Sequence, residues 1–337
     1  AELLGCSESE LVWTSGATES DNLAIVGAAR YRADRGRHLV TMPTEHKAVA
    51  DVFRVLEKQG FEVSWLRPDD AGVLDPAKLE AAMRPETQLV SIMHVNNETG
   101  VIQDIEALGA ICRERDVLFH VDAAQSVGKL PLALASLPVD LLSTTAHKVY
   151  GPKGIGALYV RNHDPIVRLE AQTTGGGQEE GRRSGTLNVP GIVGFAAAMQ
   201  LCINEMESEI PRLSALRRRL IDGIIARVEE IQLIGPALPE HEEISNPTRL
   251  PGNLNLAFAG LDGQTLMLHM PGLAISSGAT CASIDPKPSQ VLSSLGLSDD
   301  LARSCLRFGL GRFNTDADVE FAIDAVADAT QRLRLLG

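Results

Sequence analysis

Short apolar runs alternate with amphipathic stretches through the first two hundred residues of the chain. Seven runs have the length and composition of strands: Leu11–Thr14, Leu39–Met42, Val63–Leu66, Leu89–Val95, Val117–Val121, Asp140–Thr144 and Ala157–Val160. The stretches between them predict helices at Asp21–Arg35, Lys47–Gln59, Pro76–Met83 and Ile105–Arg115. This alternation predicts an α/β domain, in which helices flank a mostly parallel sheet.

From about residue 192 the pattern becomes that of a long helix, and we expect Pro211 to break or restart it. A smaller α+β region follows. Its predicted strands are Ile231–Ile234, Asn253–Phe258, Ala274–Ser276 and Leu306–Gly309, its last helix is Asp316–Leu336, and Ala237–Pro251 is predicted to be a surface loop. We therefore divide the chain into a large domain, 1–206, and a small C-terminal domain, 207–337.

Polar residues follow four of the predicted strands. In open α/β sheets, ligands bind beyond the carboxyl ends of the strands, so these residues are expected to converge on one edge of the sheet. They are Ser15–Glu19, Asn96–Glu98, the pair Asp122 and Gln125, and the group Thr145, His147 and Lys148.

A lysine and a carboxylate at such strand ends suit pyridoxal phosphate. The aldehyde of this cofactor forms a Schiff base with a lysine such as Lys148, and its ring nitrogen needs an acid such as Asp122. His46 could stack on the ring and move protons near neutral pH, and Asn97 and Gln125 could hold the phenolic oxygen. Each residue by itself also has an ordinary structural explanation, such as a capped strand end or a structural histidine.

The turn Ser15–Ser20 lies between a predicted strand and a predicted helix, where free backbone N–H groups favour a phosphate. Thr145 and His147 could add donors from the neighbouring strand end. The run from Gly175–Gln178 to Arg183–Thr186 is a second, weaker candidate for an anion-binding loop. An ordinary capped helix start remains an alternative for the first turn.

Two further residues suggest chemistry in the C-terminal region. Arg307 is a charge inside an apolar strand, which predicts either a bound substrate carboxylate or a structural ion pair. Cys281 lies among small residues and predicts an accessible, reactive thiol on an exposed loop, with an incidental loop thiol as the alternative. The remaining cysteines are in apolar contexts and are predicted to be buried: Cys6, Cys112, Cys202 and Cys305.

Composition narrows the class of protein. The chain has 337 residues, of which 44% are hydrophobic, and a net charge of −13, which argues against a nucleic-acid-binding role. No apolar stretch is expected to approach the about 20 residues of a membrane span, and no signal peptide is visible, so we expect a cytoplasmic protein. The five cysteines include no Cys-x-x-Cys, which favours a reducing compartment and argues against a structural zinc site.

Taken together, these motifs resemble the cysteine desulfurases of the NifS/IscS-like type, within the class V aminotransferase family. The resemblance extends over essentially the whole chain. The segments that carry it are Thr14–Ala24, Thr44–Val49, Ser91–Gly100, His120–Lys129, Ala146–Gly156, Arg183–Thr186 and Leu306–Arg312.

The resemblance implies a homodimeric fold-type I pyridoxal phosphate enzyme. Lys148 would carry the cofactor, Asp122 would pair with its ring nitrogen, His46 would stack on the ring, and Asn97 and Gln125 would lie near its phenolic oxygen. The implied phosphate ligands are Ala17, Thr18, Thr145 and His147, joined by Thr186 of the partner subunit.

The resemblance also implies the reaction. Arg307, with Asn97 nearby, would bind the carboxylate of L-cysteine. Lys148 would remove the Cα proton, and Cys281 would attack the substrate sulfur, which leaves alanine and a Cys281 persulfide. The sulfur would pass to an iron–sulfur scaffold protein or to sulfur-carrier proteins.

The sequence departs from the family pattern in two ways. The family usually has a substantial segment before the position of Ala1, so we expect this sequence to begin inside a domain. The segment Gly278–Cys281 reads Gly-Ala-Thr-Cys, where Gly-Ser-Ala-Cys is more usual.

Two other functions remain open at this point. One is a selenocysteine lyase or another class V pyridoxal phosphate enzyme, against which the cysteine on a long loop argues. The other is a truncated, inactive form that binds a scaffold, against which the intact Lys148, Asp122, Arg307 and Cys281 argue.

Overall fold

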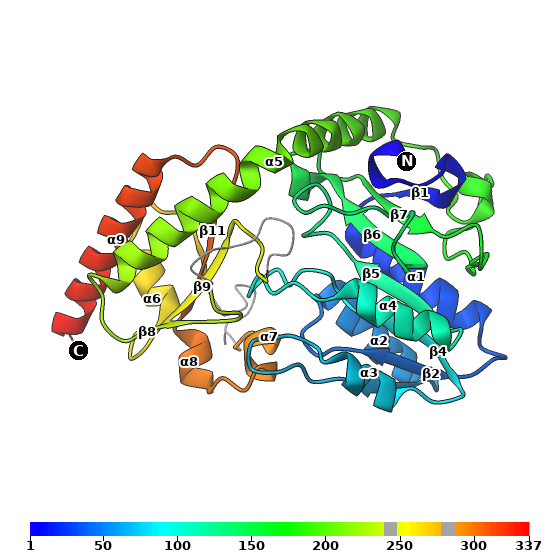
Figure 1. Cartoon of the computed structure of the whole chain (residues 1–337), viewed down its shortest axis with the longest axis horizontal. Helices are drawn as coiled ribbons and strands as arrows, with labels where there is room; N and C mark the ends of the chain where they lie inside the picture. The colour runs from blue at the N-terminus through cyan, green and yellow to red at the C-terminus, as the bar shows by residue number, and fades with distance from the viewer. Residues whose placement is uncertain (239–247, 278–287, 337) are drawn as a thin grey trace. The chain divides into compact units, whose positions relative to one another are not determined.

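The computed structural model describes residues 1–238, 248–277 and 288–336, and the chain divides into two compact units (Figure 1). The first consists of Ala1–Pro68, Leu74–Asn96 and Gln103–Met206, and the second of Asp69–Val73, Asn97–Ile102 and Glu207–Gly337. Two short segments of the first 206 residues thus belong with the second unit, which the sequence pattern did not indicate.

The first unit contains a seven-stranded sheet in the order β1-β7-β6-β5-β4-β2-β3. Strands β2 to β6 pair parallel with one another, whereas β7 pairs antiparallel with both β6 and β1. The predicted mostly parallel sheet is therefore confirmed. The strands are β1 (Leu11–Thr14), β2 (His38–Thr41), β3 (Glu62–Trp65), β4 (Thr87–Ser91), β5 (Leu118–Asp122), β6 (Leu141–Thr145) and β7 (Gly156–Val160).

Helices cover both faces of this sheet. One apolar core joins a face of the sheet to α1 (Ala17–Tyr31) and α2 (Lys47–Lys58). A second core joins the other face to α3 (Pro76–Ala82), α4 (Ile105–Glu114) and the first part of α5 (Val189–Ile225). Because both faces are covered, the central strands are buried along their whole length, which explains why they read as continuous apolar runs. Short 3-10 helices lie at Glu2–Leu4, Glu8–Glu10, Ala146–Val149 (η3) and Glu179–Gly181.

Strand β4 is shorter than its apolar run. The prediction extended it to Val95, but the strand ends at Ser91. Beyond that point hydrogen bonds to β5 continue, since the N–H of His94 donates to the carbonyl of Asp122 at 2.9 Å, but the N–H of Met93 donates to a side chain, Glu45 Oε1, at 2.8 Å. The apolar side chains after Ser91 are therefore buried although they lie beyond the end of the strand.

Helix α5 corrects two predictions. It continues through Pro211, although proline removes one backbone hydrogen bond from the helix interior. It is also long and apolar enough, by length and composition, to pass a test for a membrane span, so the expectation that no stretch approaches that length was wrong. One such helix is weak evidence for a membrane span: Phe195, Met199 and Cys202 of α5 are buried in the core of the first unit, whereas 28% of its apolar window is buried in all.

The second unit contains an antiparallel sheet in the order β10-β11-β9-β8, as the predicted strands indicated. Its core packs this sheet against α9 and the second part of α5. The short helices were not predicted, because five or six residues show too little periodicity. The elements are β8 (Ile231–Leu233), β9 (Asn253–Phe258), α6 (Gly263–Leu268), β10 (Ser276–Ser277), α7 (Gln290–Ser294), α8 (Asp299–Arg303), β11 (Cys305–Gly309) and α9 (Asp316–Leu336). Most of the predicted loop 237–251 lies outside the described residues.

Candidate active site

The start of α1 and the end of β6 lie against each other. Gly16, the residue before α1, has a φ of 154°, and a Cβ placed on it would lie 3.6 Å from Thr145 Oγ1. A Cβ on Gly156 would lie only 2.6 Å from the Cα of Gly16, so glycine is required there for the close approach. The predicted convergence of these two strand ends is present in the structure.

This junction offers hydrogen-bond donors to an anion. Nothing among the described residues accepts a hydrogen bond from the backbone N–H of Ala17 or Thr18, and both N–H groups belong to the first turn of α1. Thr145 Oγ1 lies 3.0 Å from His147 Nδ1 and donates at 3.3 Å to the carbonyl of Ile155, so a strand-end hydroxyl and an imidazole lie together beside these N–H groups. Such a set of backbone and side-chain donors at a helix start is suited to a phosphate.

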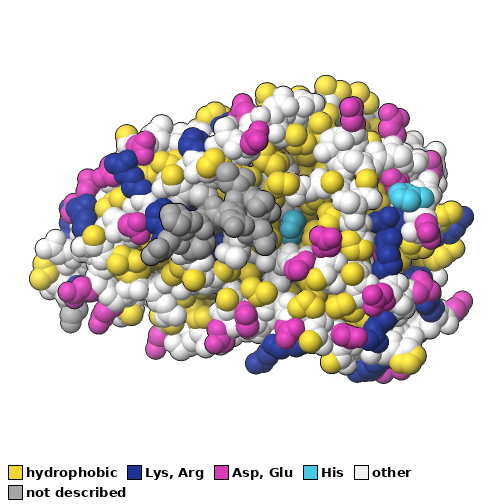
Figure 2. Space-filling model, viewed as in Figure 1, with side chains coloured by type: hydrophobic (Ala, Val, Ile, Leu, Met, Phe, Trp, Pro, Cys, Tyr) yellow, Lys and Arg dark blue, Asp and Glu magenta, His cyan; other side chains and the backbone are white. Residues whose placement is uncertain are grey.

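Cations surround His147. Partial burial lowers the pKa of its imidazole below the usual value, and the charges of Lys148, Lys153 and Lys129 lower it further. Three lysine charges therefore act on one side chain at the end of β6. This local positive field favours an anion, although the chain as a whole is acidic and Figure 2 shows Lys and Arg side chains interspersed with Asp and Glu.

Lys148 and Asp122 occupy the ends of neighbouring strands. Lys148 is exposed on η3, directly after β6, and Asp122 is the last, buried residue of β5. Asp122 Oδ1 accepts a hydrogen bond from the N–H of Ala124 at 2.9 Å. Burial raises the pKa of Asp122, whereas that hydrogen bond and the charges of His46 and Lys148 oppose the rise. Asp122, His46 and Lys148 thus lie within electrostatic reach of one another.

His46 and Gln125 each have one polar atom engaged. His46 caps α2, since its Nδ1 accepts a hydrogen bond from the N–H of Ala48 at 3.1 Å, so the neutral ring carries its proton on Nε2. Gln125 Oε1 accepts from Lys129 Nζ at 3.3 Å, which leaves the amide NH2 of Gln125 as a donor for another group. Burial lowers the pKa of Lys129 to about 8, and the charge of Lys148 adds to the effect.

Thr186 is exposed on a loop that is tied to the start of α1. Arg183, three residues earlier, donates from Nε to Glu19 Oε1 at 2.7 Å, and Glu19 Oε2 accepts from the N–H of Ser15 at 2.6 Å. Burial acts to raise the pKa of Glu19, but these hydrogen bonds outweigh it, so the pKa is lowered. The ion pair of Arg183 and Glu19 therefore joins the loop that carries Thr186 to the turn before α1, the candidate phosphate-binding turn.

Arg307 and Asn97 belong to the second unit and form a pair there. The Arg307 guanidinium donates to the carbonyl of Asn97 at 2.7 Å and to Ser276 Oγ at 3.3 Å. Asn97 Oδ1 is buried and has no hydrogen-bond partner among the described residues. Within the described part of the chain, no carboxylate lies within 4.0 Å of Arg307, which argues against the ion-pair alternative.

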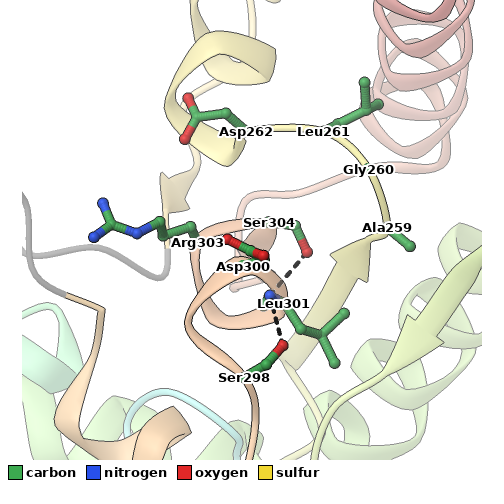
Figure 3. A pocket seen from close by; sticks show the side chains of 9 residues that line it. All are labelled: Ala259, Gly260, Leu261, Asp262, Ser298, Asp300, Leu301, Arg303 and Ser304. Atoms are coloured by element: carbon green, nitrogen blue, oxygen red, sulfur yellow. Dashed lines mark hydrogen bonds between the residues drawn. The ribbon is translucent and has the colours of Figure 1, made fainter.

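Of two surface cavities, one is lined by predicted site residues and the other is not. One, of about 460 Å³ in the first unit, is lined by Thr18, Asn22, Val26, His46, Lys47, Ala48, Asp51, Val52 and Val55. It therefore includes two of the predicted cofactor-binding residues. The other, also of about 460 Å³, lies in the second unit beside α6 and α8, where Asp262, Asp300 and Arg303 line it (Figure 3) and none of the predicted site residues is found.

Cys281 lies outside the described residues. Three of the other cysteines, Cys112, Cys202 and Cys305, are buried as predicted. Cys6, predicted to be buried, is only half-buried, and it packs at the edge of the core of the first unit.

Comparison with known proteins identifies the family. Residues 1–321 match the aminotransferase class-V family. The chain is 53% identical over 336 residues to a protein named cysteine desulfurase IscS from Pasteurella multocida (strain Pm70), covering 100% of this chain and 80% of that relative. This chain belongs to the cysteine desulfurases of the class-V aminotransferase family.

Further relatives agree with this assignment. The desulfurase chain is 52% identical over 334 residues to cysteine desulfurase IscS of Anaeromyxobacter dehalogenans (strain 2CP-C), covering 99% of this chain and 80% of the relative. A solved structure described as a NifS-like protein superimposes with a TM-score of 0.88 at 34% identity, covering 98% of this chain and 85% of that one. The fold is thus that of the fold-type I pyridoxal phosphate enzymes.

The residues present fit the cofactor of this family. The donors at the start of α1, together with Thr145 and His147 in their positive field, match a phosphate. Asp122 presents a carboxylate for a ring nitrogen, and the exposed Lys148 presents an amine for an aldehyde. The desulfurase therefore has a suitable residue for each part of pyridoxal phosphate.

Sequence reasoning missed several polar residues of this desulfurase. Asp21, Glu45 and His120 are buried around Asp122, and Lys129 and Arg183 hold other site residues in place. The available signal was a charge within an otherwise apolar or small-residue context, as in Asp21 before the apolar face of α1. Such a charge cannot be assigned to a site until its partners are known.

Proposed function

We propose that this chain converts L-cysteine to L-alanine and keeps the released sulfur as a persulfide on Cys281. The observation that carries the proposal is the convergence at one sheet edge of the α1 donors, Thr145 and His147 with Lys148 and Asp122. This arrangement supports the role that the family relationship implies for each residue.

Each part of the cofactor is proposed to have its own binding residues. Ala17, Thr18, Thr145 and His147 bind the phosphate, with Thr186 of the partner subunit as a further donor. Asp122 bears the negative charge at the ring nitrogen, His46 stacks on the ring, and Asn97 and Gln125 donate to the phenolic oxygen. When bound, pyridoxal phosphate supplies an electron-accepting ring that stabilises negative charge at the substrate Cα.

The chain's own residues bind and orient the substrate. Arg307 binds the carboxylate of L-cysteine through two of its N–H groups, with Asn97 beside it. Lys148 removes the Cα proton at Nζ and later returns a proton to carbon. His46 is proposed to move a proton through Nε2, since its Nδ1 is engaged in the capping bond with the N–H of Ala48.

The sulfur step balances without an external oxidant. The Cys281 thiolate attacks the sulfur of the substrate, an S–S bond forms, and the bond between sulfur and the substrate Cβ breaks. Cβ keeps the electron pair and takes up a proton, so it is reduced to the methyl group of alanine. The Cys281 sulfur is oxidised to the persulfide level in the same step.

The family relationship also supports finer expectations about partners and place. We infer that the enzyme works as a homodimer in the cytoplasm and passes sulfur to an iron–sulfur scaffold protein or to sulfur-carrier proteins. Neither a membrane nor a nucleic acid is a proposed partner.

The mass of the Cys281-containing peptide tests the proposal. After the full chain is treated with pyridoxal phosphate and L-cysteine, we expect this peptide to gain one sulfur atom while L-alanine appears. Cys281→Ser, the matched control, removes the acceptor sulfur and the mass increase. Alanine without a persulfide would indicate a lyase, and neither product would reject the proposed function.

Substituting Arg307 tests the substrate assignment. Arg307→Lys retains the positive charge but loses the fork of N–H donors, so we expect the KM for L-cysteine to rise about 10- to 100-fold while kcat changes less. Steady-state kinetics with L-cysteine as the varied substrate measures this split.

Arg219→Lys is the control for Arg307→Lys. Arg219 lies in the same unit and pairs at the surface with Asp316 and Glu320, so its substitution should leave both constants unchanged. An unchanged KM in Arg307→Lys would remove Arg307 from the substrate site.

A further inference from the structure

A fully buried carboxyl group lies behind the strand end that carries Asp122. Asp21, in the second turn of α1, has an exposed fraction of 0%, and so does His120 in β5. Because side chains alternate along a strand, Leu118, His120 and Asp122 share one face of β5, and Leu118 belongs to the core formed with α1. The polar group of Asp21 and His120 therefore lies between that apolar core and the candidate active site.

His120 is held by neighbours on both sides. Its Nδ1 lies 2.8 Å from Ser91 Oγ in β4, and its Nε2 lies 3.0 Å from Ser143 Oγ in β6. The same Nε2 is 3.6 Å from Asp21 Oδ1, which is too long for a hydrogen bond. Neither carboxyl oxygen of Asp21 has a hydrogen-bond partner in the described part of the chain.

This geometry disfavours a negative charge on Asp21. An ionised carboxylate without donors is very costly to bury, so such a group takes up a proton instead. The neighbouring groups add to the effect, since Asp122 of β5 and Glu45, just before α2, are both carboxyls. Burial is the largest cause that raises the pKa of Asp21 well above its usual value, and the charge of Asp122 is the next. The Ser143 hydroxyl, which lies nearby but also serves His120, acts in the opposite direction, and Glu45 adds a smaller rise.

His120 does not supply a compensating cation. Burial lowers the pKa of its imidazole to about 3, and both ring nitrogens already lie within hydrogen-bond distance of serine hydroxyls. Asp122, by contrast, receives the backbone N–H of Ala124 and is favoured as an anion by the charges of His46 and Lys148. When carboxyls share one site, the group with the better donors ionises first.

We propose that Asp21 is a positioning residue that remains a neutral carboxylic acid at neutral pH, so that the negative charge of this carboxyl cluster resides on Asp122. The importance of that charge rests on the proposed function, whereas the neutral state of Asp21 does not. Glu45 is the other member of the cluster, and its Oε2 is also buried without a partner among the described residues.

The pH dependence of stability tests the neutral state in the chain without added cofactor. When folding raises the pKa of a carboxyl group, the folded protein loses stability as pH rises from the pKa of the unfolded state, about 3.9, toward the pKa of the folded state. Asn cannot titrate, so the Tm of Asp21→Asn relative to wild type should increase between about pH 5 and about pH 8, by about 3 °C or more.

The decisive quantity is how the Tm difference between Asp21→Asn and wild type changes with pH. A poor fit of the Asn side chain would change the Tm of the variant by the same amount at every pH. Asp34→Asn, at an exposed site in the same unit, is the matched control and should show a difference that does not vary with pH. A Tm difference for Asp21→Asn that stays constant between about pH 5 and about pH 8 would show an Asp21 that is ionised throughout this range and overturn the proposal.

Infrared spectroscopy provides a second test that does not need the Asn variant to fold. Wild-type protein at neutral pH should show the carbonyl stretch of a protonated, buried carboxylic acid. Glu45→Gln should retain that band if Asp21 contributes to it. The absence of the band from the wild type, or its complete loss in Glu45→Gln, would contradict the proposal.

The loaded enzyme separates the two proposals. The absorbance of the lysine-bound cofactor, followed against pH, should keep its midpoint in Asp21→Asn, because a neutral group replaces a neutral group. If the chain does not bind the cofactor, the proposed function is rejected. The Tm and infrared measurements, which need no cofactor, then still decide whether Asp21 is protonated. A shifted midpoint in Asp21→Asn would show that Asp21 carries charge.

Discussion

Lys148→Ala is expected to lower the rate of alanine formation from L-cysteine by about a thousandfold or more. Lys148 stands exposed on η3 at the end of β6, beside the donors Thr145 and His147, and it is the amine that the reaction needs for both covalent attachment and proton transfer. Because the same amine serves both purposes, the loss should appear in kcat and in kcat/KM. Measurement of alanine release under saturating L-cysteine checks this result, and the persulfide on Cys281 should disappear with it.

Lys153→Ala is the matched control for Lys148→Ala. Lys153 also acts on His147 through its charge, so both variants weaken the positive field at this strand end. Only the Lys148 variant removes the reacting amine, and the Lys153 variant should retain most of the activity. Equal losses in the two variants would mean that Lys148 acts only through its charge and would reject the proposed mechanism.

Asp122→Asn is expected to reduce kcat/KM by about 10²- to 10³-fold, the usual effect of removing one preorganised electrostatic group. The amide can still accept the hydrogen bond from the N–H of Ala124, so the local backbone should be preserved. What is lost is the negative charge that keeps a ring nitrogen protonated. The comparison of kcat/KM between the variant and the wild type measures this loss, and the absorbance of the bound cofactor should change as well.

The pH profile distinguishes a charge effect from a packing effect at Asp122. Since burial raises the pKa of Asp122, the wild type should lose activity on the acid side as this group takes up a proton. The pH profile of Asp122→Asn should lack this loss of activity on the acid side. Asp116→Asn, at an exposed site after α4, should resemble the wild type in both rate and profile. An Asp122 variant with wild-type activity would remove this residue from the cofactor site.

The periodicity of the sequence predicted most of the first unit. Each of the seven apolar runs overlaps a strand, most of them with ends shifted by one or two residues, because the central strands, buried on both faces, must be apolar at nearly every position. The end of β4 could not be predicted in this way, since Ile92 and Met93 are as buried as the strand residues. Their backbone N–H groups donate to the carbonyl of His120 and to Glu45 Oε1, which are distant in sequence.

The error at Pro211 has a similar cause. Proline disfavours a helix interior through local geometry, and the sequence alone offers no reason for the helix to continue. Packing of α5 residues on both sides of Pro211 favours one continuous helix, since Ile210 and Leu216 are buried along with Phe195. Tertiary contacts therefore outweigh one missing hydrogen bond.

Residues at the carboxyl ends of strands could be predicted as a site because the rule for parallel sheets depends only on the order of elements. The structure brings Thr145 to the start of α1 and places Asp122 near Lys148 and His46. The roles of these residues stay predictions until the variants are measured. The buried Asp21 could not be foreseen, because its helix position alone does not show that it meets His120.

By itself, the sequence determined the family, the mostly parallel sheet and the strand ends where the reacting residues lie, because these depend on motifs and on local periodicity. Only the tertiary structure decided that α5 is one helix and that segments 69–73 and 97–102 belong with the second unit. It also decided that Asp21 is buried without hydrogen-bond partners among the described residues. The physical reason is that burial and charge depend on groups far apart in the chain, which no local pattern records.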